Sequence, residues 1–100
     1  MKIQDLSSFP GADLIEEGLR DLTEARESIP SLLVRIGRPR LERLGLEVPA
    51  RSPMERDDDL PEHRLYHLLA ATDPDSAHSR YNTLIRRLVS FERAAECAGR

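Results

Sequence analysis

The chain has few of the side chains on which disulfide, metal and base-stacking chemistry depend. Of its 100 residues 4% are aromatic, none is tryptophan, and Cys97 is the only cysteine. A single thiol excludes a disulfide within the chain and a four-cysteine zinc site. The low aromatic content predicts a core built mainly from leucine, isoleucine, valine and alanine, and it offers few rings on which nucleic-acid bases could stack.

Long apolar runs are also missing. No uninterrupted apolar stretch approaches the roughly 18 residues that a membrane span requires. The N-terminal residues Met1–Asp5 lack the basic start and the apolar stretch of a secretory signal. We therefore expect a cytoplasmic protein without a membrane segment.

Strand-like alternation is equally scarce, because no segment rich in β-branched residues alternates apolar and polar positions. The apolar residues instead have helical spacing, in segments separated by proline and glycine. A length of 100 residues is close to the commonest domain size. The sequence therefore predicts an all-α, single-domain bundle of four to five helices over residues 1–100, with 1–10 as an N-terminal extension and 46–57 as a loop.

The charge is unevenly distributed along the chain, although its sum is only −3. Residues 1–30 carry 3 basic and 7 acidic groups, and residues 57–79 carry 1 and 6. Residues 31–56 carry 6 basic and 3 acidic groups, and residues 80–100 carry 5 and 2. This alternation favours acidic helices packed beside basic ones. The alternative is one basic surface, formed by the second and fourth segments, that meets an anionic partner.

Apolar spacing predicts a first helix over residues 11–27. Gly18 lies inside it, where glycine costs about 1 kcal/mol relative to alanine, so we expect it to mark the close approach of another helix. A later helix is predicted to run to about Ala71, with Asp59 as its N-terminal cap and Glu62 completing a capping box.

Two short helices are predicted in the middle of the chain. Ser28 followed by Pro30 is typical of a helix start, and Gly37 is expected to end that helix. A second short helix should then run from Pro39 to Leu44 and end at Gly45. Two short helices around a glycine turn also suggest a DNA-binding helix-turn-helix, but the second helix has under two turns with which to read bases.

The last predicted helix, residues 74–98, has the most regular pattern. Its apolar positions are spaced alternately by four and three residues, which is the a/d spacing of a coiled coil over three heptads. This long amphipathic helix either packs on its own chain or pairs with a second chain. For the second case the predicted interface, with Arg87 and Glu92 as an interchain ion pair, consists of Tyr81, Leu84, Ile85, Leu88, Phe91, Arg87 and Glu92.

Arginine supplies fourteen of the fifteen basic residues. Arginine makes bidentate contacts with phosphate more readily than lysine does. A weak nucleic-acid-binding surface is therefore a second hypothesis, in which the contacts would come from Arg38, Arg40, Arg43 and Arg86. Arginines flanking an apolar seam are also typical of stems that cover apolar surface while the charge stays in water.

His63 and His67 are four residues apart, which places two imidazoles on one helix face at a spacing that can chelate a metal. Arg64 occupies the position where a zinc protease of this spacing needs a glutamate, so that interpretation fails. A third ligand could be His78, Asp59 or Glu62, but no spacing fixes it. The run of aspartates at 57–59 lacks the alternating ligands and turning glycine of a calcium loop. No metal site is assigned.

The sequence contains no P-loop, no dinucleotide-binding fingerprint and no glycine-flanked serine elbow. We therefore expect no catalytic residues and no cofactor. The predicted function is a small, non-catalytic protein–protein interaction protein of bacterial type: a self-associating adaptor, regulator or antitoxin-like partner that forms a homodimer and binds a further, unidentified protein. The alternatives are a nucleic-acid-binding regulator and a metal-binding accessory subunit of an enzyme.

Overall fold

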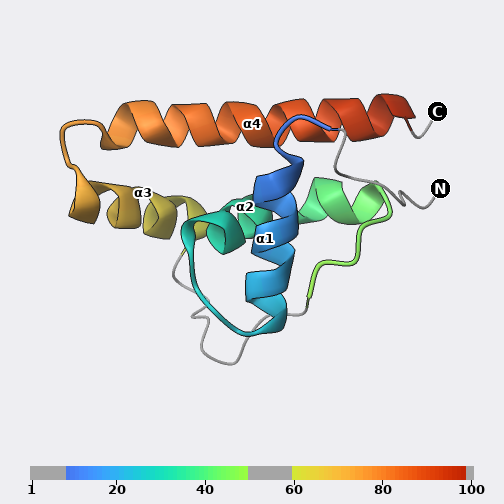
Figure 1. The fold of residues 1–100 in the computed structure, drawn as a ribbon, viewed down its shortest axis with the longest axis horizontal. Coiled ribbons are helices and arrows are strands. Elements are labelled where there is room, and N and C mark those ends of the chain that lie inside the picture. The colour runs from blue at the N-terminus through green and yellow to red at the C-terminus, as the bar shows by residue number, and fades with distance from the viewer. Residues whose placement is uncertain (1–8, 50–59, 99–100) are drawn as a thin grey trace.

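The computed structural model describes residues 9–49 and 60–98 and shows four helices (Figure 1). They are α1 (Ala12–Thr23), α2 (Ile29–Arg43), α3 (Pro61–Thr72) and α4 (Ala77–Ala98). These ranges contain no strand, which confirms the all-α prediction. Of the predicted loop, residues 46–49 are non-helical; the rest of it, the aspartates at 57–59 and most of the N-terminal extension lie outside the described residues.

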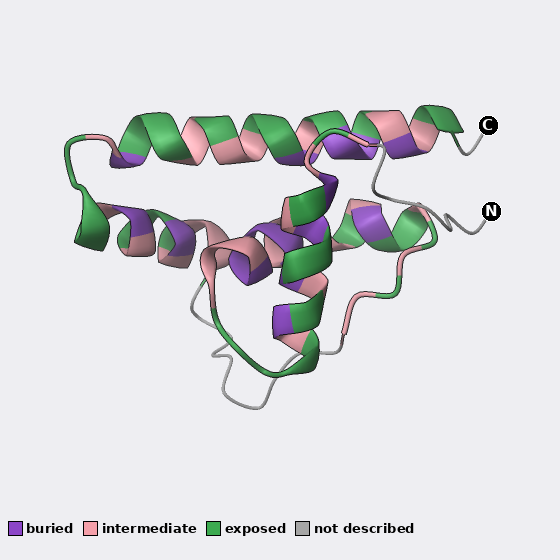
Figure 2. Ribbon diagram, viewed as in Figure 1, coloured by how far each residue is buried: buried purple, intermediate pink, exposed green. Residues whose placement is uncertain are grey.

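Helix α2 lies at the centre of the fold and contacts each of the other three helices. Helix α3 is joined to α4 by a tight turn and runs back beneath its N-terminal half, whereas α1 crosses at a steep angle (Figure 1). The purple surfaces in Figure 2 face one another across these contacts. The largest fully buried side chains are Phe91, Ile15, Leu32, Leu33, Leu41, Leu65, Leu69 and Val34.

The prediction of two short helices between residues 29 and 44 is wrong, because α2 continues through Gly37 and Pro39. Leu33, Gly37 and Leu41 are four residues apart and all buried, so they form one continuous face. A side chain at Gly37 would place its Cβ 2.8 Å from Leu88 Cδ1, so the glycine permits the close approach of α4. Packing along this face offsets the roughly 3 kcal/mol cost of a proline inside a helix.

The helix-turn-helix hypothesis is wrong as well, because it requires a turn at Gly37 and α2 is helical at that residue. The predicted end at Gly45 is confirmed: this residue is left-handed, with φ of 97°. The Leu46 amide donates to the Leu41 carbonyl at 3.1 Å, as in a Schellman cap. The predicted start is confirmed as well, because the Ser28 hydroxyl accepts from the Ser31 amide at 3.1 Å.

Helix α1 ends at Thr23, four residues before its predicted end. Ala25 takes the left-handed conformation, with φ of 56°, and the Arg26 amide donates to the Asp21 carbonyl at 2.7 Å. This is a Schellman cap without the glycine that normally signals it. Gly18 has the expected role, because a Cβ there would overlap the Pro30 carbonyl oxygen of α2.

Candidate interaction surface

The residues predicted to form an interface on α4 divide into two groups. Leu88, Phe91 and Glu92, in the C-terminal half, are buried within the chain. Leu88 faces Gly37, and the ring of Phe91 meets that of Phe9 edge-on, with centroids 5.8 Å apart. These three residues therefore belong to the core of a single chain.

The N-terminal group remains partly open to solvent. Tyr81, Leu84 and Ile85 are half-buried and pack against the edge of the core. The Tyr81 ring lies 6.1 Å from that of Tyr66, which is itself exposed, and burial raises the pKa of the Tyr81 hydroxyl. Arg87 is exposed. The apolar residues of the predicted heptads are therefore buried in the C-terminal half of α4 and partly exposed in its N-terminal half.

Both members of the expected interchain ion pair have partners within the chain. Arg87 Nη2 donates to Asp13 Oδ1 of α1 at 3.3 Å. Glu92 lies 3.8 Å from Arg40 of α2, and Arg40 also donates to Glu96 at 2.7 Å. Burial raises the pKa of Glu92, and the Arg40 charge opposes this shift. The hydrogen bond to Glu96 raises the pKa of Arg40.

The Arg87–Asp13 pair joins a basic segment of the sequence to an acidic one, as the alternating charge pattern predicted, whereas Arg40 and Glu96 both belong to basic segments. A further pair links Arg64 of α3 to Glu27, in the segment between α1 and α2, and both of these residues belong to acidic segments. These pairs are at least partly exposed on one side, so solvent and salt weaken their contribution to stability.

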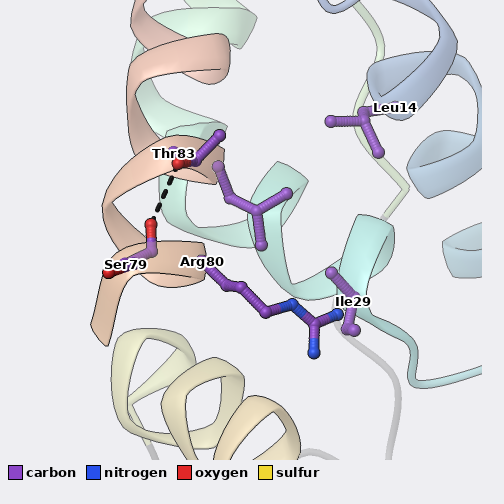
Figure 3. A pocket seen from close by; sticks show the side chains of 6 residues that line it. Leu14, Ile29, Ser79, Arg80 and Thr83 are labelled. Carbon is purple, nitrogen blue, oxygen red and sulfur yellow. Dashed lines mark hydrogen bonds between the residues drawn. The ribbon is translucent and has the colours of Figure 1, made fainter. Parts of the chain in front are cut away.

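An open apolar groove of about 400 Å³ separates the N-terminal half of α4 from α1 and the start of α2 (Figure 3). Leu14, Ile29 and Leu84 form its apolar walls. Ser79, Arg80 and Thr83 border it on α4. The Thr83 hydroxyl donates to the Ser79 carbonyl at 2.9 Å, so this polar group is satisfied by its own helix. The groove is therefore mainly an apolar surface with one charged side chain.

That charged side chain, Arg80, is exposed and extends toward Ile29 in Figure 3. It forms no salt bridge with any residue in the described ranges. The pKa of Asp73 is lowered chiefly by the hydrogen bond from Ser76, with a small contribution from the Arg80 charge. Arg80 is thus a solvated cation at the edge of an apolar groove.

The four arginines proposed to bind nucleic acid do not gather into one free basic surface. Arg38 pairs with Glu42 at 3.1 Å and donates to the Pro49 carbonyl. Arg40 is engaged by the carboxylates of α4 described above. Arg43, whose Nε donates to the Pro39 carbonyl at 3.4 Å, and Arg86 are exposed on different helices.

A second cavity, of about 340 Å³, is lined by Arg40, Arg43, Leu44 and Glu96. The Glu96 carboxylate already occupies the hydrogen-bonding position on Arg40. A phosphate group there would lie close to the carboxylates of Glu96 and Glu92 and be repelled by them, so the cavity is poorly suited to an anionic ligand.

The two histidines of the metal hypothesis, His63 and His67, are exposed on α3. Within residues 9–49 and 60–98 no group of three or more histidine, cysteine, aspartate or glutamate side chains is placed to hold a metal ion. His78 lies near Asn82, 3.2 Å away on α4. Asp59 lies outside the described residues.

Sequence reasoning located Leu84 but missed the two residues opposite it in the groove. Leu14 lies beside the main apolar stripe of α1, and Ile29 is the first residue of α2. Single apolar residues at the edge of a stripe are ordinary in a soluble domain. Only the angle between α1 and α4 brings them together, and no local pattern encodes that angle.

Comparison with protein-family models, with curated proteins and with solved structures found no match to this chain. Among the described helices, none has both the length and the apolar character needed to cross a membrane. A function for this chain therefore has to be inferred from the geometry of its own residues.

Proposed function

We propose that this chain is a small, non-catalytic protein–protein interaction protein that self-associates through the N-terminal half of α4. One observation carries the proposal: the groove beside Leu84 is apolar and open, and residues 9–49 and 60–98 of a single copy leave it uncovered. Contiguous exposed apolar surface in a small domain is typical of an interaction site.

A second partly open apolar area lies on the side of α4 that meets α3. Tyr81 and Ile85 are half-buried there, and Tyr66, whose ring lies 6.1 Å from that of Tyr81, is 40% exposed. Burying apolar surface of this kind in a complex contributes about 25 cal/mol per Å² to the free energy of association. A second copy of the chain is a natural cover because the same surface is present on both partners.

The length of α4 and its packing on α2 support the same interpretation. The helix has 22 residues, and its C-terminal half is fixed on α2 through Leu88 and Gly37. The helix therefore holds Tyr81, Leu84 and Ile85 in fixed relative positions, which lowers the entropic cost of presenting them to a partner.

The proposal is tested by measuring the sedimentation mass of the full chain over a range of concentrations. We expect the wild type to shift from monomer to dimer. Leu84→Asp should remain monomeric while keeping its helical circular dichroism, because a charge in the groove cannot be buried in an apolar contact. Asn82→Asp is the matched control, since Asn82 is two residues from Leu84 and therefore lies on roughly the opposite side of α4. A wild type that stays monomeric throughout the range would contradict the proposal.

A further inference from the structure

Arg80 lines the groove on α4, and an acidic face of α1 lies beside Leu14, which lines the opposite wall. Asp13 and Glu17 are four residues apart on α1 and therefore lie on the same face of that helix. Asp13 contacts Arg87 of α4, so this acidic face is the one directed toward α4. Arg80 precedes Arg87 by two helical turns and lies on the same side of α4.

The Asp13–Arg87 pair joins the first turn of α1 to the middle of α4. Nearby, a Cβ on Gly11 would lie 2.9 Å from the Arg87 carbonyl oxygen, so the start of α1 is held against α4. From there the helices diverge at a steep angle (Figure 1). Glu17, one turn further along α1, and Arg80, two turns back along α4, are both exposed, and no salt bridge joins them. Arg80 lines the groove, and Glu17 is one helical turn from Leu14 of its opposite wall.

From this arrangement we propose that a second copy of the chain docks across the groove about a two-fold axis, with Glu17 of each copy facing Arg80 of the other. A two-fold contact brings residue i of one copy to residue j of its partner and residue j to residue i. An apolar surface with an acid beside one wall and a base on the other is therefore complementary to itself.

The apolar and charged parts of this surface have different effects on the dimer. Leu14, Ile29 and Leu84 lose contact with water on docking, which stabilises the dimer. The Glu17–Arg80 pairs set the orientation of the two copies, since like charges facing each other are strongly unfavourable. This inference rests on the proposed self-association and specifies its geometry.

Charge reversal tests the geometry. Glu17→Arg alone places two arginines at each contact, and Arg80→Glu alone places two glutamates there. We expect each variant to raise the dimer dissociation constant by about tenfold or more. Both residues are exposed and outside the core, so circular dichroism should show unchanged helix content in both variants.

The decisive sample is a 1:1 mixture of the two variants. In that heterodimer, the arginine introduced at position 17 of one copy faces the glutamate introduced at position 80 of the other, and the remaining contact is the native pair. Sedimentation of the mixture should recover the wild-type dimer. Sodium chloride should weaken the wild-type dimer, because exposed pairs are screened.

The outcomes separate this inference from the proposal on which it rests. If both variants dimerise as well as the wild type, or if the mixture does not recover the dimer, the two-fold geometry is overturned while self-association stands. If the wild type itself is monomeric at every concentration, both fail, and the groove belongs to a different partner.

Discussion

The two halves of α4 have nearly the same heptad spacing but different surroundings. In the C-terminal half, Leu88 and Phe91 are covered by α2 and by Phe9, and even the charged Glu92 is buried. In the N-terminal half, Leu84 remains half-exposed beside an open groove, and Tyr81 remains half-exposed beside Tyr66 of α3. A heptad seam therefore indicates which residues share a face, whereas the neighbouring helices determine whether that face is core or surface.

The difference depends on how closely α2 approaches. Gly37 allows α2 to come within contact of Leu88, and none of the four described helices covers Leu84 in the same way on the side of the groove. Because α1 diverges from α4 after the Asp13–Arg87 pair, the groove is a consequence of the crossing angle.

Truncating a ring in each half should have the largest effect and the clearest contrast. Phe91→Ala removes a fully buried side chain and should lower the free energy of unfolding by about 3–5 kcal/mol. Tyr81→Ala removes a half-exposed ring and should cost about 1–2 kcal/mol. Urea unfolding followed by circular dichroism measures both. Equal losses would show that the two halves are buried alike.

Adding volume to each half is the next test. Gly37→Leu would force a side chain into Leu88 and Glu92, and should cost about 1–3 kcal/mol. Thr83→Leu adds volume at the edge of the groove, where space is available, and should change stability by less than about 0.5 kcal/mol. Thermal melts of dilute samples separate these results from dimerisation, and a large loss in the Thr83 variant would mean that the groove is filled.

The smallest expected effect concerns pH. Burial raises the pKa of Glu92 in the folded state, so the folded protein binds its proton more tightly than the unfolded chain does. Stability contributed by protonated Glu92 is therefore present at low pH and is lost as pH rises above the ordinary carboxyl range. Glu92→Gln should remove this decline.

The measurement is the free energy of unfolding as a function of pH for both proteins, in which the Glu92→Gln variant gains relative to the wild type as pH rises. Glu96→Gln is a suitable comparison, because Glu96 is less buried and lies at the same helix contact. A wild-type decline that persists in the Glu92 variant would contradict the assignment.

The sequence predicted the helical class, the start of α2 at Ser28 and its end at Gly45, because each depends on local patterns and capping residues. It also predicted the role of Gly18. It missed the continuity of α2, because glycine and proline normally interrupt helices and only packing against α4 shows why they are tolerated here. It placed the end of α1 too late, because Ala25 gives no signal for a left-handed turn.

The candidate surface was only partly predictable for a related reason. The apolar residues of α4 follow from spacing, but burial of Leu88 and exposure of Leu84 depend on neighbours distant in sequence. Leu14, Ile29 and Glu17 are ordinary residues in their own helices. They form a surface with Leu84 and Arg80 only after α1 has been placed across α4.

The central claim, that α4 is core at one end and interface at the other, is tested most directly by hydrogen exchange of its backbone amides at low and high protein concentration. Amide protection reports the local free energy of opening. The claim predicts that protection around Phe91 is high and independent of concentration, while protection from Ser79 to Ile85 rises as the concentration increases. Protection that is independent of concentration along the whole helix would contradict it.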